Sequence, residues 1–260
     1  MRNIRSYTDL QLYQKCPRLF AFSLEYNPLE ETEAINTGLF THEAIFAYFR
    51  GTDWSQAIAN RANLAITKLD GLEDANKKGK ALKVLEAASK RAESLAHRYL
   101  EKWAKDWTAP IIEPELRLGK VVAHPDLIAY LKIGDTKFRT IVDFKTSRSP
   151  DIRWYNISSQ CDVYAYILKE GYQDNIHLIA YDVISDDGIY RHTRPPRLKW
   201  GENLFKAIEQ LAVLPIHYRP LFAFDCPQKC AFWEACYLME TDAEEACREY
   251  LEKYYIRKKE

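Results

Sequence analysis

The stretch that decides the fold is Ile141-Val142-Asp143-Phe144-Lys145-Thr146, which follows His124-Pro125-Asp126 in the chain. Side chains alternate between the two faces of a β-strand, so Asp143 and Lys145 share one face while their apolar neighbours point into the body of the protein. If Asp126 lies on a neighbouring strand, two carboxylates and one lysine converge. Oxygen ligands of this kind suit a divalent metal ion, and the lysine can orient a water molecule or stabilise charge on a phosphate.

These residues alone leave a second interpretation open. An Asp-x-Lys sequence at a strand edge is common by chance, and an exposed Asp–Lys pair contributes little. The rest of the chain must decide between a reaction centre and a solvated pair.

Composition indicates an ordinary globular protein of 260 residues, 47% hydrophobic and 28% charged. Basic and acidic residues are equal at 37 each, so no global positive field attracts nucleic acid. DNA binding would need a local patch, and one candidate lies between residues 77 and 91. A solvated helix face explains that patch equally well. Its basic residues are Lys77, Lys78, Lys80, Lys83, Lys90 and Arg91.

The sequence predicts an intracellular protein without a membrane span. No stretch approaches the roughly 18 consecutive apolar residues of a transmembrane helix, and the first residues, Met1 to Ser6, lack the apolar segment of a secretory signal. In the cytoplasm thiols stay reduced, so the six cysteines are not expected to form a disulfide framework.

Periodicity predicts a mixed α/β domain whose sheet lies in the middle of the sequence. A helix starts at Ser6 and runs through Phe20, and a turn at Asn36-Thr37-Gly38 leads into a helix opened by His42. Two long helices fill residues 53 to about 106, with a break near Gly71 or Gly79.

About three strands then span residues 111–144, separated at 119–120 and 134–135. A helix covers residues 158–168, and strands at 176–184 and 188–193 are joined by a turn. Residues 200–214 are helical, and a charged helix begins near Ala243. We expect one domain, residues 1–260. Residues 1–110 are mostly helical, 111–195 form the catalytic sheet, and 196–260 hold a helix and a cysteine segment.

Four motifs in order carry a family resemblance. Gly38-x-x-x-His42, Pro125-Asp126, Asp143-Phe144-Lys145 and Gln160-x-x-x-Tyr164 resemble the RecB-type branch of the PD-(D/E)XK nuclease superfamily. The opening Ser6-Tyr7-Thr8 with Cys16-Pro17-Arg18, and a closing cysteine triplet, resemble its iron–sulfur members. Those include the CRISPR-associated adaptation exonucleases and the AddB nuclease domain. The resemblance spans residues 6 to about 237.

The resemblance implies a restriction-endonuclease-like core, a central mixed sheet flanked by helices, with a helical N-terminal region and a cysteine-bound C-terminal segment. It also implies a site for Mg²⁺ or Mn²⁺. Its ligands would be His42, Asp126, Asp143 and the carbonyl of Phe144. Lys145 would position or deprotonate the attacking water, or stabilise charge, and the sequence does not choose between these roles. Gln160 and Tyr164 share a helix face that would border the active site.

The cysteines suggest a second metal site. Cys226, Cys230 and Cys236 stand close together, and three such thiols in a reduced compartment usually bind metal. The resemblance supplies Cys16 as the fourth ligand and implies a 4Fe–4S cluster, with Zn²⁺ as the alternative. The gap between the first two thiols has three residues where the family leads us to expect two. Cys161 and Cys247 fit buried apolar positions, with Cys247 as the reserve ligand.

The sequence therefore predicts a metal-dependent deoxyribonuclease, an exonuclease acting on single-stranded DNA or DNA ends. An endonuclease on the same core, a catalytically silent DNA-binding or assembly scaffold, and a zinc-stapled interaction protein remain alternatives. No G-x-x-x-x-G-K-[ST] motif for ATP is present, so duplex unwinding would need a separate motor. By analogy, a helicase, an integrase or a recombination protein is a plausible partner.

Overall fold

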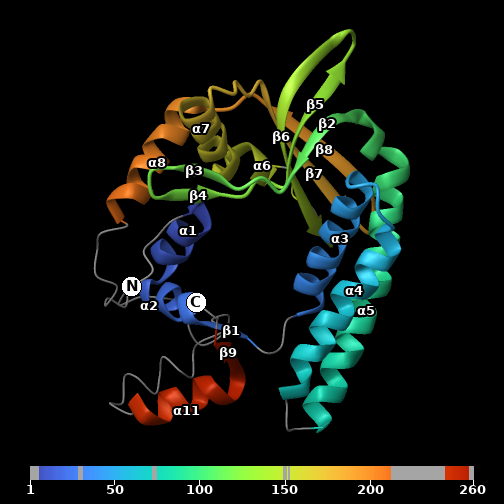
Figure 1. The fold of residues 1–260 in the computed structure, drawn as a ribbon, viewed down its shortest axis with the longest axis vertical. Helices are drawn as coiled ribbons and strands as arrows, with labels where there is room; N and C mark the ends of the chain where they lie inside the picture. Colours follow the sequence, from blue (N-terminus) through green and yellow to red (C-terminus); the bar gives the residue numbers. More distant parts are fainter. Residues whose placement is uncertain are drawn as a thin grey trace. The chain divides into compact units, whose positions relative to one another are not determined.

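The computed structural model describes residues 6–28, 32–71, 75–148, 151, 153–211 and 244–257 (Figure 1). These residues belong to two compact units. The larger unit spans residues 31–204, and the smaller one joins residues 1–30 to residues 205–260.

A five-stranded mixed sheet forms the centre of the larger unit. Its strand order is β2-β5-β6-β7-β8, and β6 pairs in parallel with β7 while the other neighbours are antiparallel. The predicted α/β class with a mixed central sheet is confirmed. The strands are β2 (Trp107–Ile112), β5 (Leu127–Ile133), β6 (Thr136–Ser147), β7 (Leu178–Ser185) and β8 (Ile189–Arg194).

Helices cover both faces of this sheet (Figure 1). On one side α3 and α5 pack against β6 and β7, with α4 against both helices, and on the other side α7 packs against β6. The helices are α3 (Glu33–Phe49), α4 (Trp54–Lys68), α5 (Ala75–Lys102), α6 (Arg153–Ile157), α7 (Gln160–Tyr172) and α8 (Leu198–Leu211), with short 3-10 turns at Leu69–Gly71 and Ala104–Asp106. The boundary between the two units falls within α8.

The prediction of about three strands in residues 111–144 was too low. The chain forms β2, β5 and β6, and between them a separate two-stranded hairpin of β3 (Leu116–Leu118) and β4 (Val121–Ala123). The predicted turns at 119–120 and 134–135 are confirmed, and the glycine in each has a positive φ, 56° at Gly119 and 59° at Gly134. Glycine adopts this conformation without steric cost, which is why these two positions end strands.

The predicted turn at Asn36-Thr37-Gly38 was wrong. These residues lie inside α3, which starts at Glu33 with Thr32 as its N-cap, so His42 lies in the middle of the helix and does not open it. Gly38 serves close packing, because a Cβ there would lie 3.0 Å from the Thr146 hydroxyl on β6. The glycine brings α3 close to the end of the strand that carries Asp143 and Lys145.

The smaller unit brings the two ends of the chain together. Strand β1 (Tyr26–Pro28) pairs antiparallel with β9 (Tyr255–Arg257), and Cys247 and Leu251 pack with Tyr26 in a small apolar cluster. The helices of this unit are α1 (Tyr7–Lys15), α2 (Pro17–Glu25) and α11 (Glu244–Tyr254).

The N-terminal helix begins as predicted but ends early. Ser6 and Asp9 form a capping box, with backbone-to-side-chain bonds of 3.1 and 3.0 Å. The helix then breaks at Cys16, where φ is −164°. Proline disfavours helical backbone in the preceding residue, so Pro17 ends α1, and it is well suited to the first position of α2.

None of the described helices is both long and apolar enough to cross a membrane.

Candidate functional site

Strand β6 places Asp143 and Lys145 on one face at the centre of the sheet. Val142 and Phe144 point to the opposite face, where both are fully buried against α3 and α5, as the alternation predicted. Asp143 is itself only 3% exposed, because α7 covers its face of the sheet. The register of the parallel pair places Tyr181 of β7 beside Asp143.

Asp126 lies directly before β5 and reaches across to β6. Its Oδ2 atom accepts a hydrogen bond of 2.7 Å from the backbone N–H of Phe144. Its own carbonyl oxygen accepts a bond of 3.0 Å from the backbone N–H of Glu113. The antiparallel pairing of β5 with β6 therefore brings the two carboxylates together, as the sequence predicted.

Lys145, on β6 like Asp143, is the third charged residue of this cluster. Its Nζ atom lies 2.6 Å from Oδ2 of Asp143. That oxygen is buried and has no hydrogen bond of good geometry, so the ion pair is its one close polar contact among the described residues. The side chain of Lys145 is 38% exposed and that of Asp143 is 5% exposed, so the cation reaches solvent and the anion does not.

His42 approaches from α3. Its Nδ1 atom lies 3.8 Å from Oδ1 of Asp126, and its ring meets the ring of Phe144 edge-on at 6.0 Å. Burial, with the charge of Lys145, lowers the pKa of His42 to about 4. The imidazole is therefore neutral at physiological pH and keeps a lone pair for a metal ion.

Asp126 and Asp143 both have a pKa above the ordinary value of an aspartate. Burial raises the pKa of Asp126 and the pKa of Asp143 to about 6, against the lowering effect of Lys145. Burial acts to lower the pKa of Lys145, but the charges of Asp143 and Asp126 outweigh it and raise that pKa. Near neutral pH the site therefore holds two anions at a cost in desolvation, with a charged ammonium beside them.

Helix α7 lines the same volume. The Nε2 atom of Gln160 donates a hydrogen bond of 2.6 Å to the hydroxyl of Tyr164, so the predicted shared helix face is confirmed. Burial raises the pKa of the Tyr164 phenol, and the charges of Asp143 and Asp126 act on it as well. Cys161, fully buried as predicted, also faces these charges, and burial raises its pKa.

Sequence reasoning missed two tyrosines and one glutamate near the site. Tyr155 of α6 stacks on Tyr181, with ring centroids 5.1 Å apart and an angle of 29° between the planes. Glu113 adopts a positive φ of 45°, and its charge acts on both His42 and Asp126. Neither the register of parallel strands nor a left-handed backbone conformation produces a periodic pattern in the sequence. The positions of these three residues therefore become visible only in the structure. Glu115, close to Glu113 in sequence, is exposed and pairs with Arg117.

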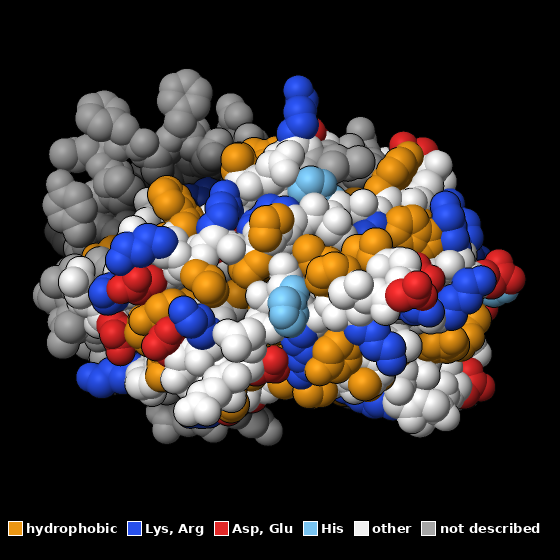
Figure 2. Space-filling model, turned by 90° about the horizontal axis from the view of Figure 1, so that it is seen from above, with side chains coloured by type: hydrophobic (Ala, Val, Ile, Leu, Met, Phe, Trp, Pro, Cys, Tyr) orange, Lys and Arg blue, Asp and Glu red, His pale blue; other side chains and the backbone are white. Residues whose placement is uncertain are grey.

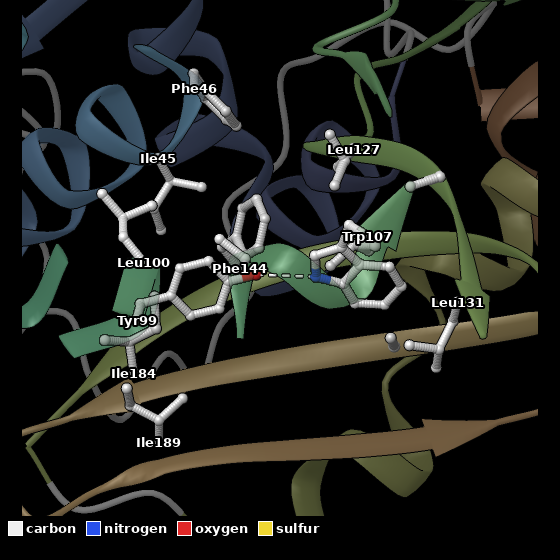
Figure 3. Close-up of a cluster of buried hydrophobic side chains, with 14 of the residues drawn as sticks. Ile45, Phe46, Tyr99, Leu100, Trp107, Leu127, Leu131, Phe144, Ile184 and Ile189 are labelled. Atoms are coloured by element: carbon white, nitrogen blue, oxygen red, sulfur yellow. Dashed lines mark hydrogen bonds between the residues drawn. The ribbon is translucent and has the colours of Figure 1, made fainter. Parts of the chain in front are cut away.

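A buried polar cluster around Asp182 lies on the sheet face opposite Asp143. Figure 3 shows two of its members among the buried apolar side chains, Trp107 donating a hydrogen bond of 3.0 Å to the Tyr99 hydroxyl. Asp182 is fully buried on β7 and accepts hydrogen bonds from the Tyr99 hydroxyl at 2.8 Å and from Trp107 Nε1 at 3.2 Å. Arg191 donates to both of its oxygens, at 2.6 and 2.7 Å. The Tyr99 ring meets Phe144 edge-on at 5.4 Å, so this cluster fixes the strand that carries Asp143 and Lys145.

The chemistry of the donors fits a divalent metal ion. Burial raises the pKa of both carboxyls although Lys145 lies beside them, which indicates negative charge that the protein balances incompletely, and Mg²⁺ or Mn²⁺ would supply that balance. Within the described ranges, no three His, Cys, Asp or Glu side chains already stand as a ready metal cage. Lys145 contacts Oδ2 of Asp143, and the backbone N–H of Phe144 donates to Oδ2 of Asp126. A bound metal ion would use oxygens of these same two carboxylates.

The proposed cysteine site falls mainly outside the described residues. Cys226, Cys230 and Cys236 all lie in residues 212–243, which the structure does not describe. Cys16 is buried, and its Sγ atom accepts a bond of 3.4 Å from the backbone N–H of Leu19. Cys247 is buried with apolar neighbours, as predicted.

Three of the six basic residues in the patch on α5 pair with acidic side chains. Lys78 pairs with Asp70 at 2.8 Å, Lys90 with Glu86 at 2.7 Å, and Arg91 with Asp186 at 2.8 Å. These three ion pairs favour the solvated-face interpretation of this patch. On the face of the molecule shown in Figure 2, basic and acidic side chains are likewise interspersed.

Comparison with known families identifies the class. The model of the PD-(D/E)XK nuclease superfamily matches residues 5–237, so this chain belongs to that superfamily. Its members are generally nucleases that hydrolyse nucleic acid with Mg²⁺ or Mn²⁺, and the mixed sheet flanked by helices is the restriction-endonuclease-like fold expected of them.

No curated protein matches the chain. A solved structure described as the crystal structure of SSO0001 is similar, at 19% sequence identity and a TM-score of 0.36. The match covers 58% of this chain and 71% of that one.

Proposed function

We propose that this protein is a Mg²⁺- or Mn²⁺-dependent deoxyribonuclease whose reaction centre is Asp126, Asp143 and Lys145. The observation that carries the proposal is the meeting of the buried Asp143 and the half-buried Asp126, both with a raised pKa, with the partly exposed ammonium of Lys145. His42, Asp126, Asp143 and the carbonyl of Phe144 would hold the metal ion. The ion would supply Lewis-acid stabilisation and a more acidic water.

Lys145 has the properties of a charge stabiliser. Hydrolysis forms one phosphorus–oxygen bond to water, breaks one ester bond and builds negative charge on the phosphate oxygens. The raised pKa keeps the Lys145 ammonium charged, so it can donate hydrogen bonds to water and phosphate but does not take a proton. We therefore favour the positioning and stabilising roles for Lys145 over that of a base.

The helix face of Gln160 and Tyr164 is proposed to border the substrate. The hydrogen bond between them fixes both polar groups, and the charges of both carboxylates reach the phenol. Tyr164 is only 5% exposed, so its role is to hold the wall of the site. Gln160 would contact Lys145 or the DNA.

We further propose that the chain belongs to the RecB-type iron–sulfur branch and carries a structural 4Fe–4S cluster. Pairing of β1 with β9 supports the proposal, because it joins the segment that follows Cys16 to the segment that follows Cys226, Cys230 and Cys236. The family match runs through residues of both units, which favours one nuclease domain over residues 1–260. Reduced thiolates and a DNA substrate fit the predicted cytoplasmic location.

Exonuclease action on single strands or DNA ends is the favoured mode. A catalytically silent scaffold with a zinc-stapled cysteine site is the alternative. Four DNA substrates incubated with Mn²⁺ distinguish these alternatives. They are linear and covalently closed circular DNA, each in single- and double-stranded form. Loss of linear DNA alone supports an exonuclease, and cutting of circles indicates an endonuclease. Binding without cleavage of any form, in protein that contains zinc and no iron, would support the scaffold.

A further inference from the structure

Helix α6 carries an exposed apolar surface. Trp154 is 66% exposed and Ile157 is 61% exposed, the two most exposed large hydrophobic side chains in the described part of the chain. They stand three residues apart, so they share one face of the helix. We call this pair the α6 ledge. Adjacent exposed apolar side chains can form part of a binding site.

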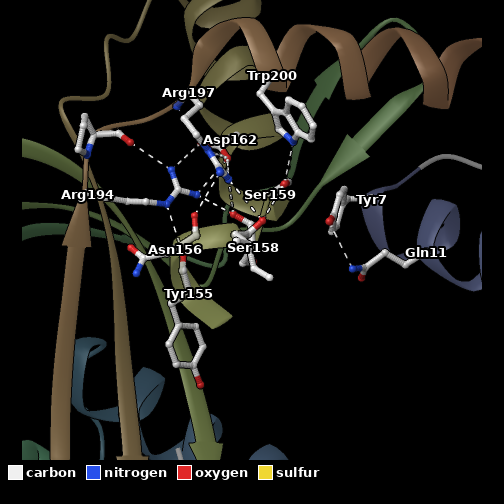
Figure 4. Close-up of polar contacts among 12 residues, drawn as sticks. Tyr7, Gln11, Tyr155, Asn156, Ser158, Ser159, Asp162, Arg194, Arg197 and Trp200 are labelled. Atoms are coloured by element: carbon white, nitrogen blue, oxygen red, sulfur yellow. Dashed lines mark hydrogen bonds and ion pairs between the residues drawn. The ribbon is translucent and has the colours of Figure 1, made fainter. Parts of the chain in front are cut away.

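The protein holds this ledge in a fixed conformation. A five-residue helix has little stability of its own in water, yet two arginines donate hydrogen bonds to its last carbonyl groups (Figure 4). Arg194 and Arg197 make these bonds at distances from 2.7 to 3.5 Å. The acceptors are the backbone oxygens of Tyr155, Asn156, Ile157 and Ser158.

One buried carboxylate anchors both arginines. Asp162 of α7 is fully buried and binds Arg194 at 2.8 Å and Arg197 at 2.6 Å. Helix α8 also approaches closely, because a Cβ on Gly201 would lie 2.2 Å from the carbonyl oxygen of Asp162. Two guanidinium groups face one carboxylate, which leaves a net positive charge at the C-terminal end of α6. A surface whose backbone is held by hydrogen bonds can bind a ligand with less loss of conformational entropy.

Helix α6 reaches the candidate reaction centre through Tyr155, which lies on a different face of the helix from Trp154 and Ile157. In Figure 4 the Tyr155 ring points away from the arginine cluster. It stacks on Tyr181, which stands beside Asp143 in the register of β6 and β7. The charges of Lys145 and Asp143 act on the Tyr155 phenol. A strand whose phosphate lies at Asp143 therefore has α6 as its neighbour.

We propose that the α6 ledge is a base-stacking surface for single-stranded DNA, with Trp154 as the stacking residue and Ile157 as its apolar support. The inference rests on the proposed nuclease function and specifies its substrate class. Aromatic side chains stack on the bases of single strands, whereas duplex bases are already stacked on each other. The partly exposed guanidinium of Arg197, at the C-terminal end of α6, complements the phosphate backbone.

Binding in EDTA tests the ledge without cleavage. Fluorescence anisotropy is measured with a labelled oligothymidylate and with a labelled duplex of equal length. Trp154→Ala should weaken single-strand binding about 5- to 160-fold, the loss of one stacked base, and leave duplex binding unchanged. Trp154→Phe should retain most of the affinity. Leu64→Ala, at a side chain on α4 that is 51% exposed, is the matched control and should change neither.

Three outcomes would overturn the ledge: unchanged single-strand affinity in Trp154→Ala, equal loss for duplex DNA, or no single-strand binding by the wild type. Thermal melts of each variant confirm that the fold is intact. Cleavage by the wild type with Mn²⁺ is scored separately. Trp154-dependent binding without any cleavage would support the ledge and refute the nuclease proposal, whereas cleavage with Trp154-independent binding would do the reverse.

Discussion

The ammonium of Lys145 lies 2.6 Å from Oδ2 of Asp143, two residues earlier on the same strand. The carboxylate of Asp143 is buried and the ammonium of Lys145 reaches solvent, so the two side chains differ in how freely they can move. Lys145 can turn toward water or phosphate, whereas Asp143 stays fixed by the sheet. A metal ion can therefore approach Asp143 while Lys145 moves to the substrate, and separate substitutions can distinguish the two roles.

Asp143→Asn should abolish cleavage without weakening the fold. The substitution removes a carboxylate whose burial is unfavourable in its charged form, so the melting temperature at neutral pH should be unchanged or higher. Activity and melting temperature are measured on the same sample. Asp135→Asn, in the exposed turn before β6, is the control and should match the wild type in both. An inactive variant that is also unfolded would leave Asp143 as a structural residue.

Divalent metal should stabilise the protein through the two carboxylates. A ligand that binds only the folded state at 100 times its Kd adds about 2.7 kcal/mol to the free energy of unfolding. Mn²⁺ should therefore raise the melting temperature of the wild type relative to EDTA. Asp126→Asn should lose this increase. An equal increase in Asp126→Asn would place the metal elsewhere.

The loss of metal affinity at low pH should follow protonation of the two carboxylates and not protonation of His42. Protons compete with metal at Asp126 and Asp143, whose pKa is raised to about 6, so metal affinity should fall as the pH drops through about 6. His42, with a pKa of about 4, stays neutral over this range. Calorimetric titration with Mn²⁺ at several pH values checks this. His42→Ala should bind more weakly with the same pH dependence, and a shifted pH dependence would contradict the assignment.

Asp182 should be a stability residue. Asp182→Ala leaves Arg191, whose side chain is 8% exposed, without its buried partner, and breaking such a pair costs about 3–5 kcal/mol. Asp106→Ala removes the exposed partner of the same arginine, 2.9 Å away, and should cost about 1 kcal/mol or less. Urea denaturation measures both. A similar decrease in the free energy of unfolding in both variants would show that burial does not determine how much each ion pair of Arg191 contributes to stability.

The cysteine proposal predicts colour. Anaerobically purified protein should absorb broadly near about 400 nm and contain iron and sulfide. Cys230→Ser should lose the colour and part of the fold, because binding of the cluster is coupled to folding. Cys161→Ser is the control and should stay brown. A stable, colourless wild type that contains zinc would favour the alternative at these thiols.

Much of this architecture could be read from local sequence pattern. Alternation placed Asp143 and Lys145 on one face of β6, and i,i+4 spacing placed Gln160 beside Tyr164, since both depend only on local geometry. Tyr155, Tyr181 and Glu113 could not be found this way. Their places depend on the crossover from β6 to β7 and on left-handed backbone at Glu113, which are tertiary features.

The two errors near the N-terminus have different causes, one tertiary and one local. Gly38 favours a turn in the sequence, but in the structure it permits close approach of α3 to Thr146. The break at Cys16 follows from Pro17, which disfavours helical backbone in the residue before it. A glycine in sequence does not reveal whether it serves a turn or close packing, because that depends on a partner distant in the chain.

The most direct test of the central claim is single-turnover cleavage of end-labelled single-stranded DNA with Mn²⁺, comparing the wild type with Lys145→Gln. Loss of one charge-stabilising group of this kind typically slows a reaction about 10²–10³-fold. We expect a decrease of that size, with metal-dependent stabilisation retained because Lys145 is not a metal ligand. Cleavage at the wild-type rate by Lys145→Gln would contradict the assignment of the reaction centre to β6.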